Sequence, residues 1–220
     1  MNTSHSRLRI YAVLFAAVGW CAVILQFFLS IDLALGNGKT VALGIIVYSG
    51  YFTILTNILA ALALTAVALP MHSPLGKHLH RPGVVTAIAA CITIVGLTYL
   101  LVLSKIWAPQ GWLWVADVVL HYVMPTAFVI FWWFAVPRGA LNWKDLPSWL
   151  VFPLGYLGYV FARGAMIGLY PYPFVDVGVL GVNAVLMNSA LIALSFIVVA
   201  ALLIVTNNYV KPKANSAKFS

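Results

Sequence analysis

Charged side chains are scarce in this sequence: Asp, Glu, Lys and Arg make up only 7% of its 220 residues, and four of these residues are acidic. A soluble domain of this size needs more charge to keep its surface hydrated. With 64% of its residues hydrophobic, the chain is therefore predicted to lie almost entirely within a membrane. Cysteine is scarce too. Cys21 and Cys91 fall inside apolar segments, so we expect no disulfide framework and interpret both as packing residues.

Long polar stretches are also missing, so no linker and no second domain are expected. Six apolar segments are each long enough for a spanning helix of about 20 residues. These segments are 10–31, 43–69, 84–104, 113–136, 149–168 and 179–206. We therefore predict an all-α fold, a single integral membrane bundle of six transmembrane helices, followed by a polar, basic tail at 207–220. The first segment is longer than a signal-peptide core and has no cleavage site, so we count it as a helix.

The net charge of +8 is best explained by membrane orientation. In a six-span arrangement Lys39 and Lys105 fall on one side, Arg163 lies within a span, and nine cationic residues fall on the other side. The nine are Arg7, Arg9, Lys77, Arg81, Arg138, Lys144, Lys211, Lys213 and Lys218. The positive-inside rule then places both termini in the cytoplasm. A nucleic-acid partner is not needed to explain the charge.

Several loop motifs resemble binding sites, but we assign no ligand or catalytic role to them. The stretch "GNGKT" (36–40) lacks the first glycine of a phosphate-binding loop, because that position is Leu33. His78 and His80 have no Cys or carboxylate beside them, so we favour a basic loop over a metal site. Residues 105–114 and 170–178 combine Trp, Tyr and Pro, which is typical of an aromatic belt; re-entrant loops over a cavity mouth are the alternative. These motifs predict no cofactor and no metal.

The stretch "DVVLHYVMP" (117–125) places an acid and an imidazole inside the fourth apolar segment. Ionisable groups within a membrane are costly, so such residues indicate a functional site. Asp117 and His121 are four residues apart and can touch on one helix. His121 would lie about 12 Å below the outer boundary, and an imidazole is the usual general base at neutral pH.

Polar residues of other segments fall in the same outer half of the membrane. Thr53 would lie about 15 Å deep, and Ser49, Thr53, Thr56 and Asn57 have the spacing of one helical stripe. The remaining polar residues at this level are Gln26, Ser30, Tyr159, Arg163, Asn183 and Asn188. We predict a pocket that opens toward the outer leaflet. Structural alternatives remain: threonine can bond to its own helix, Asn57 can link helices, and Arg163 can reach lipid phosphates.

An imidazole beside a hydroxyl group predicts nucleophilic catalysis. Thr53 would attack a carbonyl carbon, and His121 would take its proton and later protonate the leaving alcohol. Asp117 or a water would orient the imidazole ring. Donors to the oxyanion could come from Tyr48, Asn57, Tyr159, Asn188 or Arg163. A site at this depth implies a lipid-soluble substrate that enters from the membrane lipids, most simply a fatty ester.

Two motifs, "YFTILTN" (51–57) and "LHYVMP" (120–125), in a six-span chain of this length, resemble the bacterial relatives of the androgen-induced and androgen-dependent membrane proteins. The animal proteins of that family are Thr/His hydrolases of fatty acid esters of hydroxy fatty acids. The resemblance implies that Thr53 is the nucleophile, that His121 is the base, and that the protein belongs to a bacterial cytoplasmic membrane. The step from Thr53 to Asn57 is one residue longer than in the family motif, so Thr56 remains an alternative nucleophile.

Two other classes of function remain open. A carrier or lipid-binding protein would use Asp117, His121 and Arg163 as a proton relay or an anion site. Against a carrier, the sequence shows no inverted repeat and no span clearly broken at its midplane. A haem or metal protein would use His121 as an axial ligand, but no second histidine falls within a span.

Overall fold

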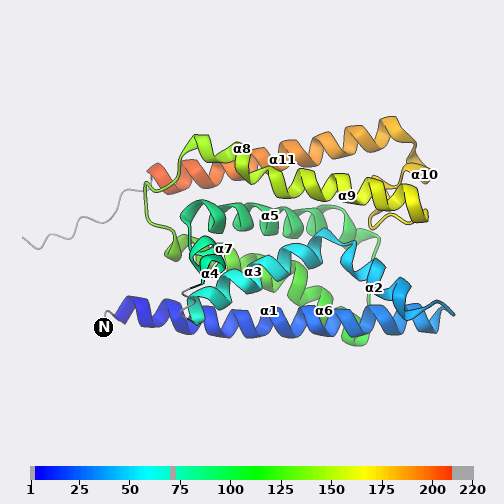
Figure 1. Cartoon of the computed structure of the whole chain (residues 1–220), viewed down its shortest axis with the longest axis horizontal. Coiled ribbons are helices and arrows are strands. Elements are labelled where there is room, and N and C mark those ends of the chain that lie inside the picture. The colour runs from blue at the N-terminus through cyan, green and yellow to red at the C-terminus, as the bar shows by residue number, and fades with distance from the viewer. Residues whose placement is uncertain (1–2, 70–72, 210–220) are drawn as a thin grey trace, which may run out of the picture.

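The computed structural model describes residues 3–69 and 73–209, and all regular structure in these residues is helical (Figure 1). In chain order the elements are α1 (Thr3–Gly36), α2 (Val41–Ser49), α3 (Phe52–Ala68), α4 (Pro74–Leu79), α5 (Pro82–Leu101), η1 (Leu103–Lys105), α6 (Gly111–Val118), the π-helical turn η2 (Val119–Val123), α7 (Met124–Ala135), η3 (Trp143–Asp145), α8 (Leu146–Trp149), α9 (Val151–Ile167), η4 (Pro173–Val175), α10 (Val177–Leu180) and α11 (Val182–Tyr209).

Five helical segments of this bundle are long and apolar enough to cross a membrane. They are Ser6–Gly36, Pro82–Lys105, Gly111–Ala135, Trp143–Ile167 and Val182–Tyr209. Large apolar side chains cover the outside of these helices: Met166 is 83% and Val151 70% exposed. An apolar surface of this kind is typical of helices surrounded by lipid, so the all-helical chain has the character of a membrane protein.

The second apolar segment is broken rather than continuous. Helices α2 and α3 meet at an angle of 71°, with Gly50 and Tyr51 between them, so the single helix predicted for 43–69 is wrong. The two helices provide a sixth span only if the bent pair crosses the membrane as one unit. The predicted stripe is also divided, because Ser49 belongs to α2, where its hydroxyl group is exposed and donates to the carbonyl of Ile46 at 3.2 Å.

Helix α9 stabilises this break. The Tyr156 hydroxyl donates to the carbonyl of Gly50 at 2.8 Å and accepts the Phe52 N–H at 3.1 Å. These are two of the backbone groups that the break leaves without helical partners. The guanidinium of Arg163 packs against Gly50 so closely that a Cβ at this position would collide with its Nη1. Glycine at position 50 therefore lets the two chain segments approach each other.

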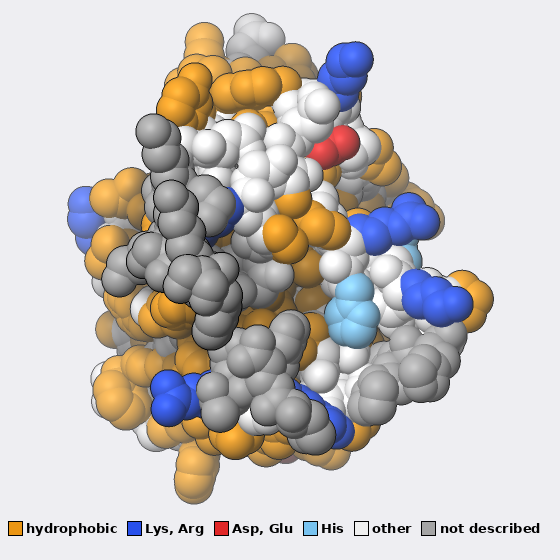
Figure 2. Space-filling model, turned by 90° about the vertical axis from the view of Figure 1, so that its left-hand side faces the viewer, with side chains coloured by type: hydrophobic (Ala, Val, Ile, Leu, Met, Phe, Trp, Pro, Cys, Tyr) orange, Lys and Arg blue, Asp and Glu red, His pale blue; other side chains and the backbone are white. Residues whose placement is uncertain are grey.

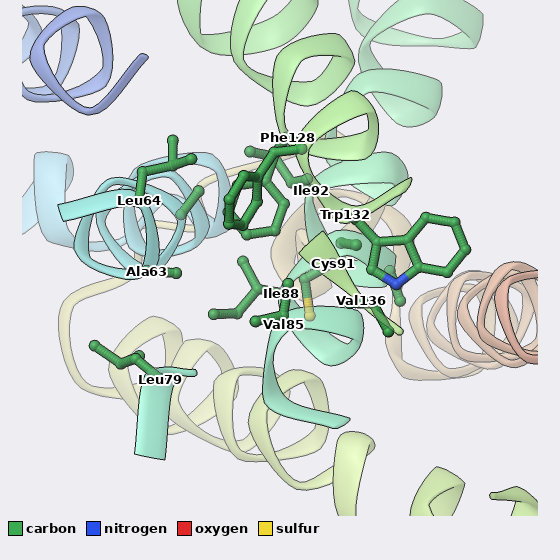
Figure 3. Close-up of a cluster of buried hydrophobic side chains, with 14 of the residues drawn as sticks. Ala63, Leu64, Leu79, Val85, Ile88, Cys91, Ile92, Phe128, Trp132 and Val136 are labelled. Carbon is green, nitrogen blue, oxygen red and sulfur yellow. The ribbon is translucent and has the colours of Figure 1, made fainter. Parts of the chain in front are cut away.

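The main hydrophobic core lies between α3, α5 and α7 (Figure 3). Trp132, Phe128 and Phe131 are its largest fully buried side chains. The indole N–H of Trp132 donates to the Thr86 hydroxyl at 2.9 Å, so its polar atom is satisfied. The core runs toward the end of the bundle where α1 begins and α11 ends, whereas α2 and α10 lie at the opposite end (Figure 1).

Basic side chains gather at the end that contains the described termini. Figure 2 shows this face, with Lys and Arg side chains spread around it and one acidic group in view. Hydrogen bonds tie the helix ends together here: for example, Arg9 donates to the carbonyl of Ala68 at 2.9 Å, and Asn207 donates to that of Pro137 at 3.1 Å. Of the tail predicted at 207–220, residues 207–209 instead continue helix α11, and residues 210–220 with their three lysines lie outside the described residues.

Candidate active site

Thr53 and His121, which are 68 residues apart in the chain, meet inside the bundle. Thr53 is the second residue of α3, directly after the break, and is only 6% exposed. Its Oγ1 lies 3.3 Å from Nε2 of His121. This distance is just outside the usual range for a hydrogen bond between a nucleophile and its base, which often tightens when substrate binds.

The π-helical turn η2 sets the position of His121. Four residues later, Pro125 has no N–H to donate to the His121 carbonyl, so an ordinary helical hydrogen bond cannot form at this point. Single π-helical turns are frequent at functional sites because they displace a side chain from its regular position. Gly96 of α5 faces this turn, and a Cβ there would lie 3.3 Å from the His121 carbonyl oxygen. The absence of a side chain at Gly96 therefore allows α5 to pack closely behind His121.

Asp117 and Tyr99 orient the imidazole ring. His121 Nδ1 lies 3.0 Å from the carbonyl oxygen of Asp117 and 3.2 Å from its carboxylate Oδ1. The other carboxylate oxygen accepts a hydrogen bond from the Tyr99 hydroxyl. The Tyr99 ring stacks on the imidazole, with 4.0 Å between the ring centroids. Since both partners of Nδ1 are acceptors, we assign its proton to Nδ1, which leaves the Nε2 lone pair facing Thr53.

Tyr172 completes the contacts of Thr53 from a loop. This residue lies between α9 and η4, and its hydroxyl is 3.3 Å from both the Thr53 N–H and the Thr53 Oγ1. Burial raises the pKa of the Tyr172 phenol to about 12, so the hydroxyl remains a neutral donor at physiological pH. The stretch 170–178 was expected to form an aromatic belt, with a re-entrant loop as the alternative; the structure buries Tyr172 of this stretch against Thr53.

The break in the second segment also gives Thr53 a helix N-terminus. The first N–H groups of a helix have no partners within it and carry partial positive charge. In α3, the Phe52 N–H is accepted by the Tyr156 hydroxyl and the Thr53 N–H by the Tyr172 hydroxyl. A negative charge that forms next to Thr53 Oγ1 would therefore meet a backbone donor, a phenol donor and the positive end of a helix.

Among the supporting residues predicted from the sequence, only Asn57 joins Asp117 at this site. Its side-chain amide donates to the carbonyl of Thr53 at 2.8 Å and to that of Leu120 at 3.2 Å. Asn57 thus ties α3 to the helix that carries His121, and its side-chain N–H groups are used in these two bonds. Thr56 is fully buried, and its hydroxyl has no hydrogen-bond partner in the described residues. The contacts therefore favour Thr53 over Thr56 as the nucleophile.

The other predicted oxyanion donors lie elsewhere. The Tyr48 hydroxyl donates to the carbonyl of Val23 at 3.0 Å, and Asn188 donates to that of Phe174 at 2.9 Å. Tyr159 is 40% exposed, and Arg163 packs against Gly50. Depth counted along the sequence does not show which way each helix face turns, so it could not exclude these residues.

A cavity of about 310 Å³ opens onto the site. Its polar wall contains Thr53, Tyr99, Asp117, His121 and Tyr172, and its apolar wall contains Leu33, Ile106, Trp107 and Leu113. Gln26 and Ser30, which are hydrogen-bonded to each other at 3.2 Å, also line it. The cavity thus presents apolar surface to a lipophilic ligand and places polar groups at one point along it.

The described residues contain no group of three His, Cys, Asp or Glu side chains with the geometry of a metal site. Comparison with models of protein families, with curated proteins and with solved structures finds no match to this chain. Its function must therefore be argued from the geometry of the site.

The contacts of Tyr99 lead to a first prediction. Tyr99→Phe keeps the ring that stacks on His121 and removes only the hydroxyl that donates to Asp117. We expect kcat on an ester substrate to fall about tenfold with little change in KM, because one hydrogen bond that orients the base is lost. Tyr122→Phe is the matched control, since Tyr122 touches Tyr99 edge-on and is 39% exposed. An equal loss in both variants would contradict a positioning role for Tyr99.

Proposed function

We propose that the protein is an intramembrane hydrolase of lipophilic carboxylic esters, with Thr53 as nucleophile and His121 as general base. The observation that carries the proposal is the distance of 3.3 Å between Thr53 Oγ1 and His121 Nε2, with Nδ1 of the same ring held by Asp117. A nucleophile, its base and a group that orients the base form the arrangement that acyl transfer requires.

The reaction begins when Thr53 Oγ1 attacks the ester carbonyl carbon and its proton passes to His121 Nε2. The oxyanion of the tetrahedral intermediate takes the place of the present hydrogen bonds and accepts the Thr53 N–H and the Tyr172 O–H. The bond to the alcohol oxygen then breaks, and His121 gives its proton to that oxygen. Water attacks the resulting Thr53 ester with His121 again as base, which releases the carboxylic acid and restores the threonine.

The proposed topology counts α2 and α3 as one bent span, which gives six spans with both termini in the cytoplasm. The cationic face at the end where α1 begins and α11 ends supports this orientation (Figure 2). Thr53 then lies in the outer half of the bilayer, where a fatty ester can enter from the membrane lipids. The resemblance of "YFTILTN" and "LHYVMP" to the Thr/His hydrolase family supports the same reaction and a bacterial cytoplasmic membrane.

The test of this proposal is turnover by the purified protein in lipid nanodiscs. We expect release of acid and alcohol from long-chain esters, including branched fatty acid esters of hydroxy fatty acids. A lipophilic fluorophosphonate should inactivate the protein and, by peptide mass spectrometry, modify Thr53. Modification of Thr56 instead would show that Thr56, and not Thr53, is the nucleophile. A folded protein that neither hydrolyses any ester nor reacts with the fluorophosphonate would refute the proposal.

A carrier is the second candidate, because the break between α2 and α3 is a feature of many transporters. This break was not expected from the sequence. Arg163, however, lies against Gly50 and does not line the cavity that contains Asp117 and His121, so the three residues do not form one relay. Proton-coupled uptake into proteoliposomes that depends on Asp117, without ester turnover, would establish the carrier.

A further inference from the structure

Two cavities meet at the proposed nucleophile. Beside the cavity of about 310 Å³, a second cavity of about 90 Å³ lies between α3, α5, α9 and α11. Thr53, Leu103 and Tyr172 line both cavities. The smaller one is mainly apolar, with walls that include Ile94, Val95, Leu157, Ile192, Ala193 and Phe196. Thr53 therefore stands at the boundary between a partly polar space and an apolar one.

An ester has one chain on each side of its carbonyl carbon, so a carbonyl at Thr53 sends one chain toward each cavity. His121 and Asp117 line only the larger cavity. The alcohol oxygen must lie within hydrogen-bond reach of His121 Nε2 to receive its proton. The alcohol part therefore lies on the side of the larger cavity. The opposite placement would direct the leaving oxygen away from His121, which must protonate it.

We infer that the acyl chain of the substrate occupies the smaller cavity between α9 and α11, while the alcohol part occupies the larger cavity. This assignment rests on the proposed hydrolase function. It identifies the wall of the smaller cavity as the surface that determines which acyl chain lengths are accepted. The smaller cavity accepts an unbranched apolar chain. The larger one accepts a bulkier alcohol with polar groups near its oxygen, which can meet Gln26, Ser30 or Tyr51.

The arrangement of α9 and α11 provides a path for a chain longer than the cavity. The two helices run along one side of the bundle (Figure 1), and their backbones make few close approaches. Helix α9 contacts α3 through side chains; for example, the rings of Phe52 in α3 and Phe152 in α9 have centroids 5.5 Å apart. Leu154 lines the cavity and is 52% exposed. The end of a long acyl chain therefore passes Leu154 into the surrounding lipid.

Ala193 offers a direct test, because its side chain lines the smaller cavity. In Ala193→Phe we expect kcat/KM for a hexadecanoyl ester to fall at least about tenfold, with less than about a twofold change for the acetyl ester of the same alcohol. The preference for alcohol length should stay as in the wild type. Ala190→Phe is the matched control, since Ala190 is exposed on the same helix. A changed preference for the alcohol, or equal losses in both variants, would overturn the assignment.

Photolabelling tests the same assignment without turnover. Thr53→Ala protein is irradiated with two non-natural esters, one with a diazirine in the acyl chain and the other with it in the alcohol chain. The acyl probe should label α9 or α11 near Leu157 and Ile192, and the alcohol probe should label residues near Leu33 and Trp107. Reversed or identical patterns would overturn the assignment. If the labelling follows the expected pattern but the wild type hydrolyses no ester, the proposed hydrolase is refuted, while the two binding sites for the chains are supported.

Discussion

Thr53→Ala and His121→Ala should each lower kcat at least about a thousandfold on any ester for which the wild type shows turnover. The reason is that either change removes one half of the pair whose atoms lie 3.3 Å apart. Without the hydroxyl no acyl-enzyme can form, and without the imidazole the hydroxyl is not a strong nucleophile at neutral pH. The double variant should be no worse than the poorer single variant, because the two residues act as one unit.

The measurement compares the purified variants with wild type on one ester, together with their thermal unfolding. Thr53→Ser keeps a hydroxyl at the same position and should retain substantial activity. Thr56→Ala is the matched control, since Thr56 is buried on the same helix but does not line the cavity. Full activity in Thr53→Ala, or its loss in Thr56→Ala alone, would show that the nucleophile was assigned to the wrong residue.

Local spacing made much of this site predictable from the sequence. The interval of four residues between Asp117 and His121 predicted a contact, and the two side chains lie 3.2 Å apart. Counting depth along apolar segments placed Thr53 and His121 at similar levels, and they meet. These predictions needed only a regular helix and a fixed rise per residue. They identified which helices contribute to the site, but not which side of each helix is turned toward it.

Features that depend on tertiary contacts could not be predicted in this way. The break at Gly50 depends on Tyr156, whose hydroxyl satisfies the backbone on both sides of it although it lies more than 100 residues away. Tyr99 lies in a segment whose composition indicates only a spanning helix, and nothing local shows that its hydroxyl faces Asp117. Tyr172 was grouped with interfacial aromatic residues, because its burial depends on how the loop before α11 folds back.

Tyr172→Phe should lower kcat about a hundredfold or more, with a much smaller effect on KM. In the described residues two side chains lie within hydrogen-bond distance of Thr53 Oγ1: His121, whose Nε2 accepts, and Tyr172, whose hydroxyl can donate. Removing one donor to an oxyanion typically costs a factor of about one hundred to one thousand in kcat. The substrate carbonyl carries little charge before attack, so most of this loss should appear in kcat rather than in binding.

The comparison that isolates this role is Tyr170→Phe, which deletes the same atom from the same loop. Tyr170 packs against Gly164 and does not line either cavity, so its variant should hydrolyse esters as the wild type does. In Tyr172→Phe the Thr53 hydroxyl and His121 remain, so the fluorophosphonate should still modify Thr53, at a reduced rate. If the Tyr172 hydroxyl only held the loop in place, thermal stability would fall and both kcat and KM would change. If the unfolding temperature is unchanged and the loss is confined to kcat, the Tyr172 hydroxyl stabilises the oxyanion and does not merely support the loop. The reason is that the oxyanion charge exists only during the reaction.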